Sequence, residues 1–368
     1  MKKRILRNIE WGILVCTILL IIIGVIALFS STQNSNYDEL KKQIMWLIIS
    51  VPVMIAVILI DYEFFAKISP VLYGISLLLL IGVLFTEPIN GATSWYSIGP
   101  FTIQPAEFAK IAVVLFTADV IVKIQKKGKT EMNRFLKLGL IILTVAVPVL
   151  LIIKQPDYGT ALAFLFALIF MLFVAGVDKK YIITSILLVV IIIPVAYFFI
   201  LPEHAKTRID VYLNPDLDPR GAGYNIIQSK LAIGAGQIFG MGLLKGNQTQ
   251  LGYLYPKTTD FIFAVIGEEM GFIVAGAVII LYVVLITKAI YVAKTAKNDI
   301  GSYIAAGIAG IFFFHMVENI GMTMGLLPIT GIPLPFVSYG GSSMLTNCIL
   351  IAILLNISGR RQKAMFRE

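Results

Sequence analysis

One acidic residue stands where a long polar segment gives way to an apolar one. Asp260 ends the segment Tyr253–Asp260 and directly precedes an apolar run. A carboxylate at the mouth of a membrane helix is costly unless it is paired or takes part in a reaction. Asp260 could act as a general base that removes a proton from a bound hydroxyl group. The alternative is that Asp260 caps the following helix, although Thr258 or Thr259 could cap it equally well.

Three further charged residues lie at the edges of apolar runs. Glu107 and Lys110 are three residues apart, so they share a helix face and can form an ion pair. The pair is either structural, or Lys110 acts with Arg208 to bind an anionic group such as a diphosphate. Asp157 could hold Lys154, cap the next helix or contribute to a cation site.

The histidines and cysteines do not form a recognisable metal motif. His204 and His315 are far apart in the sequence, and Cys16 and Cys348 each lie alone in an apolar run. A hard divalent cation, Mg²⁺ or Mn²⁺, could instead be held by Asp260 together with a phosphate of the substrate. The sequence is compatible with such an ion but does not require it.

The composition is that of a membrane protein. Of the 368 residues, 58% are hydrophobic and 14% are charged, and the mean hydropathy is +0.89. Soluble domains are about half apolar and about a quarter charged. The net charge is +9. The basic residues are placed along the chain as membrane topology predicts rather than as nucleic-acid binding would require, so we expect no nucleic-acid partner.

The apolar runs predict an all-α polytopic membrane protein of about ten transmembrane helices. The stretch Met1–Ser30 resembles a signal peptide but has no clear cleavage site, so we interpret it as containing the first span. The predicted spans are 12–30, 44–60, 70–86, 106–123, 135–153, 159–176, 181–200, 262–287, 302–325 and 341–358.

The loop charges predict the orientation. With ten spans, the basic residues concentrate on the side that holds both termini, which is therefore cytoplasmic. The segments rich in Pro, Gly and polar residues fall on the opposite, extracytoplasmic side. The longest of them, 201–261, contains an amphipathic helix at Gly223–Gly236, with Ile226, Ile227, Leu231 and Ile233 spaced to lie on the membrane or over the site. We treat 1–368 as a single domain.

Four motifs in this order resemble the SEDS family (shape, elongation, division and sporulation), the polytopic glycosyltransferases of bacterial cell-wall synthesis. The motifs are Asn90–Trp95 with Gln104–Lys110, Gln155–Thr160, Pro256–Phe263 with Gly267–Gly271, and Gly331–Ser342. The resemblance covers nearly the whole chain. Segments Asn214–Pro219 and Ile227–Gly234 look most like the elongation member of the family.

The resemblance implies an activity and a site. Such proteins polymerise the lipid-linked disaccharide-peptide lipid II into glycan strands at the outer face of the bacterial cytoplasmic membrane. Asp260 matches the family's catalytic aspartate, Glu107 and Lys110 its buried pair, and Asp157 its Pro-Asp-x-Gly aspartate. The other residues that we expect to bind substrate are Arg208, Trp95, Gln104, Lys257, Thr259, Ser338 and Tyr339.

The resemblance also implies partners and a reaction. The expected partners are a class B penicillin-binding protein that crosslinks the strands, and other membrane proteins of the elongation complex. The reaction inverts the anomeric carbon of the donor sugar, with undecaprenyl diphosphate as the leaving group. The alternatives are a lipid II flippase, a division or sporulation polymerase, and a non-catalytic scaffold. A flippase needs a polar path through the bilayer, whereas these motifs gather at one surface.

Overall fold

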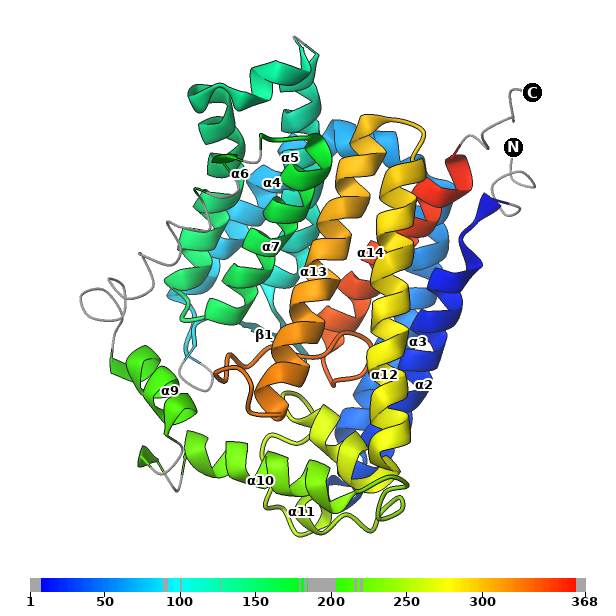
Figure 1. The fold of residues 1–368 in the computed structure, drawn as a ribbon, viewed down its shortest axis with the longest axis vertical. Coiled ribbons are helices and arrows are strands. Elements are labelled where there is room, and N and C mark those ends of the chain that lie inside the picture. The colour runs from blue at the N-terminus through cyan, green and yellow to red at the C-terminus, as the bar shows by residue number, and fades with distance from the viewer. Residues whose placement is uncertain are drawn as a thin grey trace.

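A computed structural model describes residues 8–88, 92–99, 101–126, 128–178, 180–181, 184, 203–214, 217–218 and 221–361. Within these ranges the fold is a bundle of long α-helices (Figure 1). The long helices are α2 (Trp11–Ser31), α3 (Asp38–Leu59), α4 (Tyr62–Gly82), α5 (Pro105–Gln125), α6 (Phe135–Ile153), α7 (Tyr158–Ala175), α12 (Ile262–Thr295), α13 (Asp299–Thr323) and α14 (Gly341–Arg360). Shorter elements are helices α9 (Glu203–Leu213), α10 (Ala222–Ala235) and α11 (Asn247–Gln250), strands β1 (Tyr96–Ile98) and β2 (Phe101–Ile103), and 3₁₀ turns at Gln33–Ser35, Val83–Phe85 and Lys129–Asn133.

The helices confirm a multi-pass membrane architecture. Eight helices of the described chain are long and apolar enough to cross a membrane, and each coincides with a predicted span. α5 occupies the predicted span 106–123, but it carries four charged residues, Glu107, Lys110, Asp119 and Lys123. The predicted span 181–200 lies outside the described residues apart from Tyr181 and Thr184.

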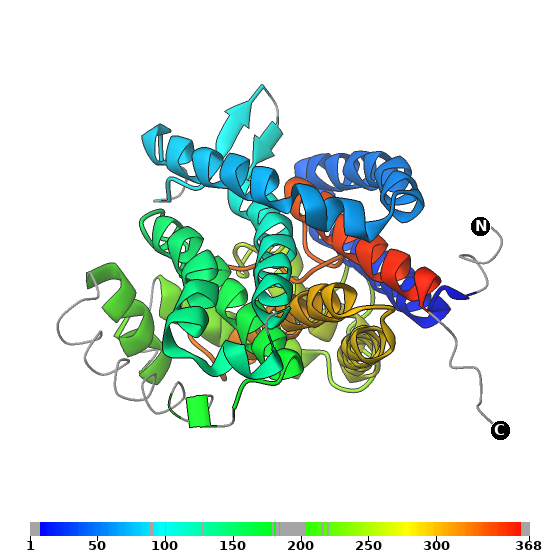
Figure 2. The ribbon, with the colours of Figure 1, turned by 90° about the horizontal axis from the view of Figure 1, so that it is seen from above.

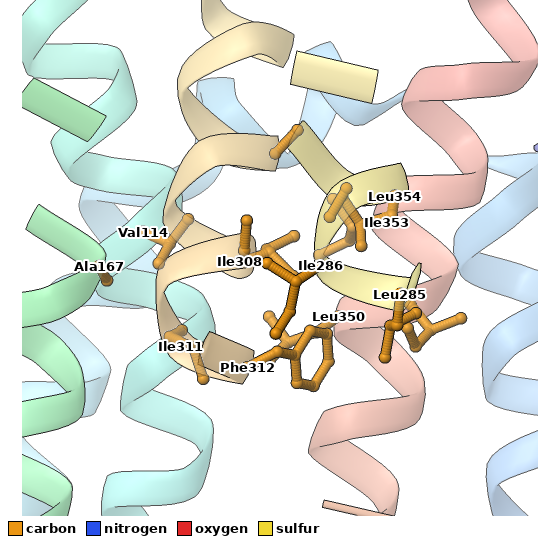
Figure 3. Close-up of a cluster of buried hydrophobic side chains, with 14 of the residues drawn as sticks. Val114, Ala167, Leu285, Ile286, Ile308, Ile311, Phe312, Leu350, Ile353 and Leu354 are labelled. Carbon is orange, nitrogen blue, oxygen red and sulfur yellow. The ribbon is translucent and has the colours of Figure 1, made fainter. Parts of the chain in front are cut away.

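α13 lies at the centre of the bundle, with α7 on one side and α12 on the other (Figures 1 and 2). Small and branched residues let the helices approach closely, and their side chains fill a continuous apolar core. Figure 3 shows part of this core, built from α5, α7, α12, α13 and α14. Its labelled members are Val114, Ala167, Leu285, Ile286, Ile308, Ile311, Phe312, Leu350, Ile353 and Leu354.

The start of α2 and the end of α14 lie side by side at one end of the bundle. Arg361 forms an ion pair with Glu10 at 3.2 Å, and Lys288 binds the same carboxylate at 2.9 Å. Helices α9, α10 and α11 lie at the opposite end (Figure 1). Helices α9–α11 are therefore separated from the start of α2 and the end of α14 by the length of the spanning helices.

α12 is kinked near its start. Gly271 has φ 76° and ψ −177°, a conformation that glycine alone adopts readily. The kink frees backbone groups of the helix, and the segment before α11 binds them: Phe272 N donates to Gln237 O at 2.9 Å and Met241 N donates to Glu268 O at 2.9 Å. The glycine-rich stretch that ends α10 thus serves close contact between two backbones.

One local feature differs from the sequence-based expectation, and α10 agrees with it. β1 and β2 form a short antiparallel hairpin in which Tyr96 pairs with Ile103, so the fold is helical with one small hairpin. α10 forms within one residue of the predicted bounds, with Ile226 buried and Leu231 52% exposed. α10 is held to the bundle by the Ser229 hydroxyl, which donates to Thr323 O at 2.7 Å.

Candidate active site

Asp260 lies in a turn immediately before α12, with its side chain partly exposed. The N-cap position of α12 belongs to Phe261, so Asp260 does not occupy the capping position that the alternative interpretation gave it. The amide of Asn319 on α13 donates to the backbone oxygen of Asp260 at 3.0 Å and to Ile332 O at 2.8 Å. One buried side chain therefore ties the turn of Asp260 to the connection between α13 and α14.

That connection, residues 324–340, also fixes the two residues before Asp260. The Ser338 hydroxyl donates to Thr259 O at 2.6 Å and accepts from Leu334 N at 2.8 Å. Tyr339 N donates to Thr258 O at 2.9 Å. Ser338 is 5% exposed and both of these bonds are to backbone, so its contribution in this structure is to hold the Asp260 turn.

The carboxylate of Asp260 faces a glycine of the same connection. A β-carbon built on Gly331 would lie 3.5 Å from Oδ2 of Asp260. Gly331 has φ +74°, in the left-handed region that favours glycine. The site thus combines a fixed backbone with a partly exposed carboxylate that has open space beside it.

Lys257 is anchored to the segment before the turn. Its ammonium group donates to Thr249 O at 2.8 Å. Burial lowers the pKa of Lys257, and the nearby carboxylates of Glu269, Glu39 and Glu268 oppose that shift. Lys257 therefore links the Asp260 turn to an acidic cluster at the start of α12.

The acidic cluster was not singled out from the sequence as part of the site. Glu268 is fully buried and accepts from Gln248 N at 2.7 Å, Thr249 N at 3.0 Å and the Thr249 hydroxyl at 2.6 Å. Glu269 accepts from the amide of Gln250 at 2.8 Å. The sequence signal for this cluster is two adjacent carboxylates in an apolar helix, which need polar partners. Those partners lie about twenty residues earlier in the chain, so the sequence does not show which residues they are.

Glu107 and Lys110 form a buried ion pair. Their charged atoms are 2.9 Å apart, and the side chains are 1% and 0% exposed. The Thr346 hydroxyl donates to Glu107 at 2.8 Å. Nε2 of His315 lies 3.4 Å from the ammonium of Lys110, and Nδ1 of His315 lies 3.1 Å from Pro333 O. Since an ammonium only donates and a carbonyl only accepts, His315 carries its proton on Nδ1.

Asp157 and Gln104 meet at the same end of the bundle. Asp157 caps α7, accepting from Thr160 N at 3.1 Å, and its second oxygen accepts from the Gln104 amide at 2.7 Å. Burial raises the pKa of Asp157 above its ordinary value, and the bonds from Thr160 partly oppose this rise. The capping interpretation of Asp157 is therefore confirmed by its geometry. Trp95 is half-buried, and its backbone oxygen accepts from the Thr86 hydroxyl at 3.2 Å.

The connection 324–340 is the common neighbour of these groups. Gly331 faces Asp260, Pro333 binds His315 beside Lys110, and a side chain at Gly159, next to the Asp157 cap, would clash with Ile332. The structure thus joins Ser338 and Tyr339 by hydrogen bonds to Thr259 and Thr258, the two residues before Asp260. The same connection reaches the neighbours of Lys110 and Asp157. Arg208 belongs to α9, and its side chain lies outside the described residues.

A small cavity adjoins the buried ion pair. It is lined by Lys110 and by mostly apolar side chains of α5, α6, α7 and α13, including Thr117, Phe164 and Met171. The cavity has room for about one water molecule. Among the described residues, no group of three or more His, Cys, Asp or Glu could hold a metal ion. An ion at Asp260 would therefore draw most of its ligands from phosphate and water, which is how Mg²⁺ is usually bound.

Comparison with known proteins agrees with the motifs. A family model for FtsW, RodA and SpoVE, described as cell cycle protein, matches residues 10–363. The peptidoglycan glycosyltransferase RodA of Treponema pallidum is 32% identical, over 98% of this chain and 100% of that protein. The peptidoglycan glycosyltransferase MrdB of Escherichia coli (strain K12) is 35% identical, over 90% of this chain and 89% of that protein.

The fold has a solved counterpart. A chain in a peptidoglycan synthase complex, described as coordinating polymerization and crosslinking, superposes with a TM-score of 0.81 at 26% identity, covering 95% of this chain and 97% of that chain. Sequence and structure agree over nearly the full length. The chain belongs to the FtsW, RodA and SpoVE family of cell cycle proteins.

Proposed function

We propose that this chain is a peptidoglycan glycosyltransferase that polymerises lipid II into glycan strands for cell elongation. The full-length similarity to proteins named peptidoglycan glycosyltransferase RodA and MrdB supports the activity and the elongation role. The observation that carries the assignment of the site is Asp260: its turn is held by three hydrogen bonds from Asn319, Ser338 and Tyr339, while its side chain stays partly exposed.

In this reaction the 4-hydroxyl of the acceptor GlcNAc attacks the anomeric carbon of the donor MurNAc. Asp260 accepts the hydroxyl proton as the new C–O bond forms and the bond to undecaprenyl diphosphate breaks. One base and no covalent intermediate are needed, so the α-linked donor becomes a β-linked product. A divalent cation bound by Asp260 and the diphosphate would stabilise the charge of the leaving group. Arg208, Lys257, Trp95 and Tyr339 are the proposed substrate contacts.

We propose that the reaction takes place at the outer face of the cytoplasmic membrane. The start of α12, which Asp260 precedes, and helices α9–α11 lie at the end of the bundle opposite the start of α2 and the end of α14 (Figure 1). The positive-inside rule favours a cytoplasmic location for the latter end. A class B penicillin-binding protein is the proposed crosslinking partner. The match to a chain of a complex that couples polymerization to crosslinking supports this pairing.

The decisive experiment compares purified wild-type protein with Asp260→Asn in a lipid II polymerisation assay. Asparagine keeps the size of the side chain but cannot take up a proton, so the rate is expected to fall by at least about 100-fold while the protein remains folded. Polymerisation at the wild-type rate would exclude Asp260 as the base. Lipid II transport across vesicles without glycan formation by the wild-type protein would instead indicate a flippase.

A further inference from the structure

α3 has an unusual buried residue. Among the eight candidate spans, α3 is the least buried, with 17% of its apolar window inside the structure. Its buried residues are Leu40, Gln43, Ser50 and Val57. The Ser50 hydroxyl donates to Trp46 O within the same helix, at 2.7 Å, whereas Gln43 reaches another segment. A buried amide costs free energy unless its polar atoms are bonded, so the partners of Gln43 indicate its role.

Both ends of the Gln43 amide bind the connection 324–340. Nε2 donates to Ser338 O at 3.1 Å, and Oε1 accepts from Gly340 N at 3.1 Å. One side chain, 1% exposed, therefore holds the backbone on both sides of Tyr339. Trp46 lies three residues later on the same face of α3, and its indole packs so closely against Gly341 that a β-carbon there would clash with Nε1.

Two residues of the segment 338–340, Ser338 and Tyr339, also hold the Asp260 turn. The Ser338 hydroxyl binds Thr259 O, and Tyr339 N binds Thr258 O. Residues 338–340 thus lie between Gln43 and the turn, with two hydrogen bonds on each side. A displacement of these residues shifts the bonding partners of the two peptides directly before Asp260.

We propose that Gln43 is a positioning residue that sets the location of the Asp260 carboxylate through residues 338–340. The proposal rests on the glycosyltransferase activity proposed above and adds α3 to the elements that control it. A misplacement of about 1 Å in a reacting group can lower a rate about 100-fold. Gln43 touches no reacting atom and acts through Ser338 and Gly340.

The test uses Gln43→Met, which keeps the length of the side chain but removes both bonds. We expect kcat for lipid II polymerisation to fall about 10- to 100-fold. KM is expected to rise as well, because Gln43 also holds the backbone on both sides of Tyr339, a proposed substrate contact. The matched control is Gln125→Met at the opposite end of the bundle, where Gln125 binds Ala175 O at 2.9 Å and the hydroxyl of Tyr303. The control is expected to reduce thermal stability but leave kcat unchanged.

Gln43→Glu gives a readout that a merely structural role would not change. A buried carboxyl group favours its neutral form, and the neutral form has one O–H donor and one carbonyl acceptor, as the amide has. The ratio of Gln43→Glu to wild-type kcat is therefore expected to rise as the pH falls from about 8 to about 6. Gln43→Met is expected to show no such recovery.

The outcomes separate the two proposals. No glycan from the wild-type protein, or full activity in Asp260→Asn, would refute the proposed function or its base. If the wild-type protein makes glycan and Asp260→Asn does not, two results would still overturn the positioning role. The first is a kcat for Gln43→Met within about twofold of the wild-type kcat. The second is a ratio of Gln43→Glu to wild-type kcat that stays constant across the pH range. Failure of both Gln43 variants to fold would overturn it as well, because Gln43 would then be a stability residue.

Discussion

The carboxylate of Asp260 and the backbone of Gly331 face each other: a β-carbon on Gly331 would lie 3.5 Å from Oδ2, in van der Waals contact with it. The two residues are far apart in sequence and belong to the turns that precede α12 and α14. Glycine at this position keeps one side of the proposed base open. A substitution at Gly331 therefore tests whether substrate reaches the carboxylate from this side.

Gly331→Ala is expected to lower polymerisation activity more than stability. Alanine at φ +74° costs about 1–2 kcal/mol, and its methyl group would narrow the space beside Asp260. Gly252→Ala is the matched control, because Gly252 has φ +79° and nothing within 4 Å of an added β-carbon. Melting temperature and kcat are measured for both. Equal losses of kcat would show that backbone strain alone explains the effect.

Breaking the buried ion pair is expected to destabilise the protein. Lys110→Met leaves the Glu107 carboxylate buried without its cation, which costs about 3–5 kcal/mol. The double variant Glu107→Gln with Lys110→Met removes both charges and is expected to recover most of that loss. Unfolding in detergent measures the free energies. A stable Lys110→Met protein that has lost turnover would instead show that Lys110 acts on the diphosphate.

Asp157 predicts a pH dependence of stability. Because its pKa is raised in the folded protein, the folded state binds this proton more tightly than the unfolded chain does. The resulting stabilisation is full below the unfolded pKa, about 3.9, and is lost as the pH rises through the folded value. Asp157→Asn cannot lose a proton, so its melting temperature relative to wild type is expected to increase with pH across this window.

A difference in melting temperature that falls over the same range would reverse the sign of the Asp157 shift. Asparagine can still accept from Thr160 N at the start of α7, so the cap itself is retained. With the cap kept, the NH2 group of asparagine faces the Gln104 amide that now donates to Asp157, and this change does not depend on pH. The variation of the melting-temperature difference with pH therefore isolates the carboxylate's charge.

The sequence predicts the spanning helices well because each must supply a long apolar run. The nine long helices of the described chain coincide with predicted spans, and the junction at Asp260 was correctly placed before α12. Gln43 could not be recognised as part of the site, because its partners Ser338 and Gly340 lie about 300 residues away. Charge and hydropathy carry no information on which distant backbone a buried amide will bind.

The details that the sequence does not predict have local causes. The β1–β2 hairpin was missed because strands of three residues show too little alternation to detect. The sequence does not predict that His315 and Thr346 contact the Glu107–Lys110 pair, because only tertiary packing brings them together.

The kink of α12 at Gly271 has a consequence for exchanging parts between relatives. The helix obtains hydrogen-bond partners from residues 237–242, and those residues obtain theirs from the helix. A chimera that takes the segment between α10 and α11 from one protein and α12 from another would separate two halves of a single backbone interface. Grafts that carry both halves together preserve that interface.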